Sequence, residues 1–198
     1  MFLLVIMKKC SIFVAKKKCM IFKGNNIILV GLPGAGKTTL GKIFAERLGM
    51  DFIDTDQYIL DKFEKNWPGR VSFFARADWL VENYTTIIDD LLETKNSVIA
   101  TGAEIVSALE MGKSLKPLGR VICIIRDSEL ILNDLENRST LKFVNAKTGE
   151  PCPFFGTPNM LLDVYKKKMH LLLNESDESI INDGTIEDGV NKLIALLR

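Results

Sequence analysis

The clearest chemical feature of the sequence is a loop suited to binding phosphate. Residues 31–38 read Gly-Leu-Pro-Gly-Ala-Gly-Lys-Thr, the pattern G-x-x-x-x-G-K-[ST]. A triphosphate needs several hydrogen-bond donors converging on crowded oxygens, and backbone N–H groups supply them only in a tightly curled loop with small side chains. Lys37 would reach the β- and γ-phosphates, and the Thr38 hydroxyl is a hard oxygen ligand for Mg²⁺. The predicted nucleotide-binding residues are Gly34, Ala35, Gly36, Lys37, Thr38 and Thr39.

The residues around this loop support the interpretation. Ile27–Val30 is an apolar run typical of a buried strand, and Lys37–Leu48 has the apolar spacing of a helix that ends at Gly49. A phosphate loop needs that order, because the N–H groups and the dipole of the helix N-terminus favour negative charge. The alternative is a Gly- and Pro-containing turn with an incidental Lys-Thr pair, which this context disfavours. We expect a purine nucleoside triphosphate, ATP first, as the ligand.

Two carboxylates follow the next strand. Asp54 ends the short predicted strand Asp51–Asp54, and Asp56 follows two residues later. In an open parallel sheet, ligands bind beyond the carboxyl ends of the strands. One carboxylate would serve the magnesium shell, and the other would accept a proton or a hydrogen bond from an acceptor hydroxyl. The alternative is structural, with Asp56 capping the helix that follows.

The remaining sequence predicts the elements that position these groups. Short apolar runs alternate with longer helical stretches, which is typical of a doubly wound α/β domain. Ser128 and Thr185 are predicted helix caps. The predicted strands are 27–30, 51–54, 97–101, 120–125 and 179–182, and the predicted helices are 37–48, 57–64, 71–94, 104–111, 128–137, 161–174 and 186–197. Residues 138–158 contain three prolines and two glycines and are a candidate lid, being too long for a simple connection.

Composition excludes several other classes of protein. The chain has 198 residues with a formal net charge of +1, which gives no overall case for binding nucleic acid. The four cysteines form no CxxC pair and no cluster with His170, so neither a zinc site nor a disulfide framework is expected, and the cytoplasm is the expected compartment. Residues 1–23 carry six lysines, no acidic residue and an apolar run too short to span a bilayer. We expect them to lie outside a single domain formed by residues 24–198, with no stable membrane insertion.

From residue 31 to Asp56 the sequence resembles the start of shikimate kinases, a family of P-loop kinases in the nucleoside-monophosphate-kinase-like group. The family pattern is G-x-x-G-x-G-K-[ST]-[ST]-x-G-x-x-[LI]-A-x-x-L followed by F-x-D-[ST]-D, and the Lys37-to-Asp54 spacing agrees with it. Weaker similarity continues through VIAT at 98–101, LENRS at 135–139 and YKKKMHLLL at 165–173. The resemblance implies a three-layer αβα P-loop kinase fold with a five-stranded parallel sheet and a lid. It also implies a role in aromatic amino acid biosynthesis.

The resemblance also implies residue roles. Lys37 and Thr38 would hold phosphate and Mg²⁺, Asp54 would serve the metal shell, and Asp56 would hold the acceptor hydroxyl and act as the base. Arg138 would be the lid arginine that stabilises the transferring charge. Gly102 belongs to the turn where, in the family, substrate meets bare backbone. The expected partner is a small-molecule hydroxyl acceptor, with shikimate as the default, and the protein is expected to act as a monomer.

The chain departs from the family pattern around the acceptor. The family has three glycines after the third strand, whereas this chain has Gly102-Ala103-Glu104. It has no arginine eight residues after Phe74-Ala75, and Leu161 occupies the position of a second family arginine, four residues before Tyr165. Arg70 or Arg76 could reach the pocket from another direction; the alternative for each is a solvated surface arginine. Three functions therefore stay open: a kinase for shikimate or another polyol or acid, a nucleotide kinase, and a non-catalytic nucleotide-binding module.

Overall fold

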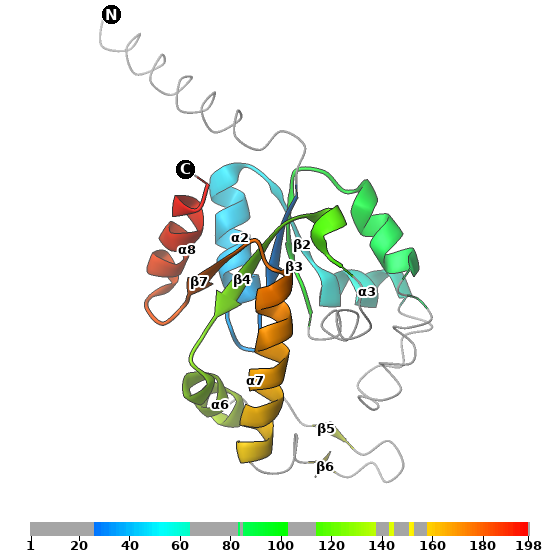
Figure 1. Ribbon diagram of the computed structural model, residues 1–198. Helices are drawn as coiled ribbons and strands as arrows, with labels where there is room; N and C mark the ends of the chain where they lie inside the picture. Colours follow the sequence, from blue (N-terminus) through cyan, green and yellow to red (C-terminus); the bar gives the residue numbers. More distant parts are fainter. Residues whose placement is uncertain are drawn as a thin grey trace, which may run out of the picture.

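Five parallel strands form the central sheet of the computed structural model (Figure 1). The structure describes residues 26–63, 83, 85–102, 114–137, 143–144, 151–152 and 158–197. The order across the sheet is β2-β3-β1-β4-β7, and each neighbouring pair is parallel. The strands are β1 (Asn26–Val30), β2 (Asp51–Asp54), β3 (Ser97–Ala100), β4 (Gly119–Ile125) and β7 (Glu178–Ile181).

Helices cover both faces of the sheet (Figure 1). α2 (Lys37–Leu48) and α8 (Ile186–Ala195) pack on one face, where Phe44 and Leu193 join a buried cluster. The opposite cluster takes Ile59 from α3 (Thr55–Phe63) and Leu172 from α7 (Pro158–Glu175). The remaining described helical segments are α6 (Ser128–Asn137), the 3₁₀ turn η1 (Lys116–Leu118) and residues 83 and 85–93.

The central strand shows why the sequence folds in three layers. All five residues of β1 are buried. Successive side chains of a strand point to opposite faces, so Ile27 and Leu29 join the cluster under α2 and α8. Ile28 and Val30 join the cluster on the other face. A strand with four consecutive apolar residues, 27–30, therefore belongs in the middle of a sheet covered on both sides.

The expected α/β fold is confirmed, with small shifts at the ends of elements. One cap was wrong: α6 begins at Ser128, but the side chain of Asp127 accepts from the N–H groups of Glu129 and Leu130, at 2.8 and 3.2 Å. The carboxylate one residue earlier reaches the free donors of the first turn. The Thr185 cap is confirmed, because its side chain accepts from Asp188 in a full capping box.

The candidate lid is described in part. Within residues 138–158, β5 (Phe143–Val144) and β6 (Pro151–Cys152) pair antiparallel, so this segment contains two short strands. α7 begins at Pro158, three residues before the expected start, and proline suits the first helical position because its missing N–H needs no partner there. The extension 1–23 and the predicted helix 104–111 lie outside the described residues.

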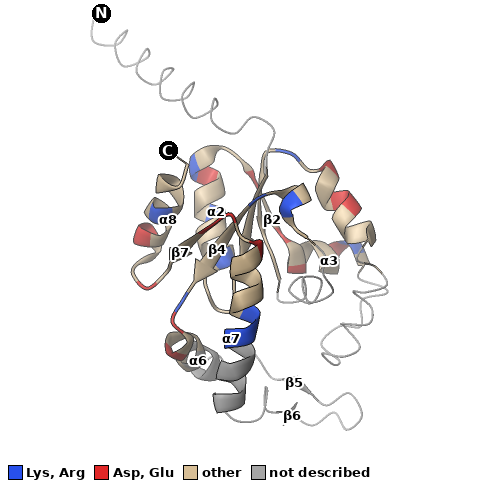
Figure 2. Ribbon diagram, viewed as in Figure 1, with Lys and Arg blue, Asp and Glu red and all other residues tan. Residues whose placement is uncertain are grey.

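Several other residues of interest lie away from the loop. Cys123 is fully buried, and burial raises the pKa of its thiol to about 11. His170, Lys166 and Lys167 are exposed on α7. Figure 2 shows a basic stretch on that helix. No described helix is both long and apolar enough to cross a membrane.

Candidate active site

The phosphate loop leaves β1 at the centre of the sheet and enters α2. Gly34 and Gly36 have φ values of 83° and 99°, in the left-handed region that glycine adopts without steric cost. Gly36 is the N-cap of α2, and the Leu40 N–H donates to its carbonyl at 2.9 Å. The loop therefore curls as the sequence predicts and directs a helix N-terminus into the site.

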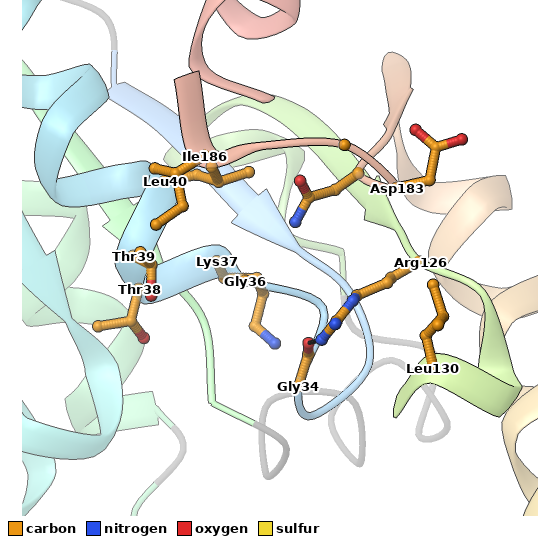
Figure 3. A pocket seen from close by; sticks show the side chains of 12 residues that line it. Gly34, Gly36, Lys37, Thr38, Thr39, Leu40, Arg126, Leu130, Asp183 and Ile186 are labelled. Atoms are coloured by element: carbon orange, nitrogen blue, oxygen red, sulfur yellow. Dashed lines mark hydrogen bonds between the residues drawn. The ribbon is translucent and has the colours of Figure 1, made fainter. Parts of the chain in front are cut away.

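Lys37 is the charged group at the centre of the loop. Its residue is only 8% exposed, and its Nζ donates to the carbonyls of Gly31 and Leu32 at 2.9 and 3.0 Å. These bonds bend the side chain back across the curl of the loop. The ammonium group thus lies within the pocket that the loop borders (Figure 3).

Two side chains from the neighbouring strand ends hold the loop. Arg126, the residue after β4, donates from Nη1 to the Gly34 carbonyl at 2.9 Å, and Figure 3 shows it reaching toward that glycine. Asn182, the residue after β7, donates from Nδ2 to the Ala35 carbonyl at 2.8 Å. Both strands end at the same edge of the sheet as β1, which is why their next residues meet the loop.

A pocket of about 390 Å³ lies beside these residues. Lys37, Thr38 and Thr39 border it from the loop and α2, and Arg126 borders it from the end of β4 (Figure 3). Beyond them the lining includes Leu130, Asn182, Asp183, Gly184 and Ile186. The pocket therefore has cationic side chains at the loop, and its farther lining combines small, apolar and amide groups with the carboxylate of Asp183. Cationic groups at one end and a mixed lining at the other suit a phosphorylated nucleoside.

Thr38 connects the loop to the first carboxylate. Its Oγ1 donates to Oδ2 of Asp54 at 2.7 Å. The other oxygen of Asp54 accepts from the N–H groups of Asp56 and Gln57, at 3.1 and 3.5 Å. Asp54 therefore caps the N-terminus of α3. The alternative in which Asp56 is the capping residue is wrong, because the capping carboxylate lies two residues earlier. β3 separates β1 from β2, yet α2 carries Thr38 across to Asp54.

The second carboxylate, Asp56, lies against Gly102. A Cβ built on Gly102 would be 1.5 Å from Oδ1 of Asp56, so only glycine leaves room for this carboxylate. The backbone of Gly102 is held in turn, because its N–H donates to Oγ1 of Thr55 at 2.7 Å. The structure thus brings together Asp56 and Gly102, two residues of the predicted acceptor site.

A second pocket, of about 650 Å³, opens on this side of Thr38. Asp54, Asp56 and Asp61 contribute carboxylates to its wall, and Lys42 contributes the one cation among its described lining residues. Thr38 borders both pockets. A phosphoryl group held at the loop would therefore lie next to the space that contains Asp56.

Several predicted residues lie outside the described part of the chain. These are Arg76, Arg138, Ala103 and Glu104, together with Arg70. Within the described residues, no group of three or more His, Cys, Asp or Glu side chains could hold a metal ion by itself. Thr38 and Asp54 do offer a hydroxyl and a carboxylate, the hard oxygen ligands that Mg²⁺ takes together with water and phosphate.

Sequence reasoning missed Arg126 and Asn182 as residues of the site. Arg126 follows a predicted strand directly, and Asn182 ends another in the sequence-based assignment. The rule that ligands lie beyond the carboxyl ends of parallel strands could have identified both. The pattern alone did not say that β4 and β7 follow β1 consecutively across the sheet, which brings their ends beside the loop.

Comparison with known proteins identifies the family and agrees with the fold. Residues 33–193 match the family model described as shikimate kinase. A shikimate kinase from Clostridium botulinum (strain Eklund 17B / Type B) is 30% identical over 169 residues, covering 85% of this chain and 94% of the relative. The structure of shikimate kinase from Acinetobacter baumannii in complex with shikimate matches with a TM-score of 0.69 and 26% identity, covering 91% of this chain and 96% of that one. Shikimate kinase from Bacteroides thetaiotaomicron shares the fold, with a TM-score of 0.65 at 23% identity and coverage of 88% and 98%.

Proposed function

The chain belongs to the shikimate kinase family, and from that membership we propose that it transfers the γ-phosphoryl group of ATP to a hydroxyl of shikimate. The bond from the γ-phosphorus to the β,γ-bridging oxygen breaks, and a bond to the acceptor oxygen forms. The products are ADP and the acceptor's phosphate ester, and the hydroxyl proton leaves to a base. The proposal extends to a monomer that acts in the cytoplasm, in aromatic amino acid biosynthesis.

One observation carries this proposal: the Thr38 hydroxyl donates a hydrogen bond to Asp54, and Thr38 borders both pockets. Phosphoryl transfer demands positioning and charge neutralisation more than covalent chemistry. Donor phosphates at the loop and an acceptor beside Asp56 would meet at this one side chain. A module that only bound nucleotide would have no need of an acceptor-side carboxylate that requires glycine at position 102.

The residues of the phosphate side divide the work by their chemistry. The ammonium of Lys37 would exchange its two carbonyl partners for phosphate oxygens, and so neutralise charge that develops during transfer. Thr38 and Asp54 would hold Mg²⁺, which supplies charge neutralisation on the phosphates when bound. The Gly36 N–H and the start of α2 would bind the anion through the backbone. Gly34, Ala35 and Thr39 complete the proposed set.

The acceptor side rests on Asp56 and Gly102. The Asp56 carboxylate would accept the proton of the attacking hydroxyl, and Gly102 leaves the space that this carboxylate occupies. Arg138 and Arg76 stay as proposed lid and acceptor residues.

A coupled assay of ADP release tests the function directly. The purified chain is assayed with ATP, Mg²⁺ and shikimate, alongside a panel of polyols, hydroxy acids and nucleosides. Acceptor-dependent ADP release with shikimate is the expected result. Turnover of a different acceptor, without turnover of shikimate, would refute shikimate as the substrate but leave kinase activity established. ATP binding without turnover of any acceptor would refute the kinase activity itself.

The role of Asp56 has its own test. Asp56→Asn keeps the shape of the side chain and its fit against Gly102, but removes the proton acceptor. We expect kcat to fall about 100-fold or more while ATP affinity changes little. Asp61→Asn, on the same helix and the same pocket wall, is the matched control and should keep most of its activity. Equal losses in both variants would contradict a specific role for Asp56.

A further inference from the structure

Asn182 lies where the sheet, the phosphate loop and α8 meet. Its backbone N–H donates to the Ile125 carbonyl at 2.7 Å, which continues the parallel pairing of β4 and β7 beyond their last paired residues, Ile125 and Ile181. The sheet therefore fixes the backbone of Asn182, and only rotation of its side chain determines which groups the amide contacts.

The side-chain amide of Asn182 lies between two glycines. Its Nδ2 donates to the Ala35 carbonyl at 2.8 Å. A Cβ built on Gly36 would be 2.6 Å from this nitrogen, and one built on Gly189 of α8 would be 2.9 Å from Oδ1. A side chain at either glycine would push the amide away. The loop and α8 are thus both shaped to admit it.

The bond to Ala35 sets the direction of a phosphate donor. A peptide unit is planar and trans, so its C=O and the following N–H point in opposite directions. The Ala35 carbonyl points at Asn182, and the Gly36 N–H therefore points away from it. The neighbouring Ala35 N–H is already bonded to the Leu32 carbonyl at 3.0 Å. Because the Ala35 N–H is already occupied, the orientation of the Gly36 N–H matters more than that of the Ala35 N–H for binding an anion.

We propose that Asn182 is a positioning residue for the phosphate loop: by holding the Ala35 carbonyl it orients the Gly36 N–H toward the nucleotide's phosphates. The inference rests on the proposed function, since it requires a bound nucleoside triphosphate. It also couples two parts of one pocket, because Asp183 and Gly184, which follow directly, line the wall away from the loop. Arg126 provides a second grip through Gly34 and does not replace the bond to Ala35.

The test separates the phosphates from the nucleoside by using three probes. Titration calorimetry measures the dissociation constants of ATP, inorganic tripolyphosphate and adenosine for the wild type, Asn182→Ala and Asn182→Asp. Loss of one hydrogen bond should weaken ATP and tripolyphosphate about tenfold in Asn182→Ala. Asn182→Asp should weaken both about 100-fold, because a carboxylate oxygen then faces the Ala35 carbonyl and adds negative charge beside the phosphates. Adenosine should bind all three proteins equally.

Asn191→Ala is the matched control. Asn191 is an exposed asparagine of α8 and lies outside the pocket. Its side chain forms hydrogen bonds with Arg47 and Glu187. It should bind each probe as the wild type does. In steady-state assays, the Asn182 variants should show a raised KM for ATP with an unchanged KM for shikimate. Circular dichroism checks that each variant is folded, and Asn182→Ser takes the place of any variant that is not.

The outcomes are distinct. Unchanged tripolyphosphate binding with weakened adenosine binding would overturn the inference, since Asn182 would then contact the nucleoside. Equal weakening of all three probes would also overturn it, since the role would be general packing. A wild type that binds neither ATP nor tripolyphosphate would refute the proposed function itself. A wild type that binds both, with variants that bind equally well, would refute only the role of Asn182.

Discussion

Gly102→Ala is the sharpest perturbation of the acceptor side. The new Cβ would lie 1.5 Å from Oδ1 of Asp56, whereas carbon and oxygen normally approach no closer than about 3.3 Å. The Gly102 backbone is held by its 2.7 Å bond to Thr55, and the Asp56 N–H is held by its 3.1 Å bond to Asp54. The backbone is anchored on both sides, so the carboxylate of Asp56, an exposed residue, must rotate away.

The size of the effect follows from that displacement. The carboxylate must move by roughly 1.8 Å to reach an ordinary contact. A misplacement of about 1 Å at a reacting group costs about 100-fold in rate, or about 2.7 kcal/mol of transition-state stabilisation. We therefore expect kcat/KM for shikimate to fall about 100-fold or more. ATP affinity should stay near that of the wild type, because Gly102 does not border the pocket at the phosphate loop.

A double-mutant cycle shows whether the effect acts through Asp56. Coupled assays of ADP release give kcat/KM for the wild type, Gly102→Ala, Asp56→Ala and the double variant, and calorimetry gives ATP affinity for each. In the Asp56→Ala background there is no carboxylate to displace, so Gly102→Ala should add little further loss. Strictly additive losses in the free energy of activation would refute the reasoning, since they would mean that Gly102 acts independently of Asp56.

Four other changes have expected outcomes. Lys37→Met removes the buried ammonium of the loop and should lower kcat about 100-fold or more in the same assay, with an unchanged circular dichroism spectrum. Arg126→Ala removes the donor to Gly34 and should weaken ATP binding about five- to tenfold by calorimetry, while a value equal to the wild type would argue against its grip on the loop. Thr185→Ala removes the N-terminal cap of α8 and should lower the free energy of unfolding by about 1 kcal/mol, measured as a fall in Tm of about 2–4 °C. Burial raises the pKa of the Cys123 thiol from 9.0 to about 11, so between these pH values the thiol loses its proton in the unfolded chain and keeps it in the native protein. The free energy of unfolding, measured with urea, should therefore fall by at most about 3 kcal/mol as pH rises through this window. The variant Cys123→Val should not show this part of the decrease.

Much of the phosphate side could be predicted from the sequence because its geometry is local. Eight consecutive residues contain the glycines that adopt positive φ, the lysine and the threonine, and the flanking apolar patterns fix the strand and the helix. The order of apolar runs also predicted a parallel sheet, since strands that alternate with helices are typical of parallel sheets. Errors occurred at element ends: Asp127 and Ser128 are both good caps, and only the backbone geometry decides which side chain reaches the free N–H groups.

The contacts between distant segments were decided by the tertiary structure. Arg126 lies 92 residues beyond Gly34, and Asn182 lies 147 residues beyond Ala35, yet both grip the phosphate loop. The strand order puts β4 and then β7 beside β1 and inserts β3 between β1 and β2, which no local pattern specifies. The closeness of Gly102 to Asp56 follows from the same order, because β3 pairs with β2. The sequence by itself determined the tight loop Gly31–Thr38, the proposed phosphate-binding loop, since a loop needs only its own residues to curl. The rest of the site needed the sheet, because only its packing brings the ends of separate strands to one place.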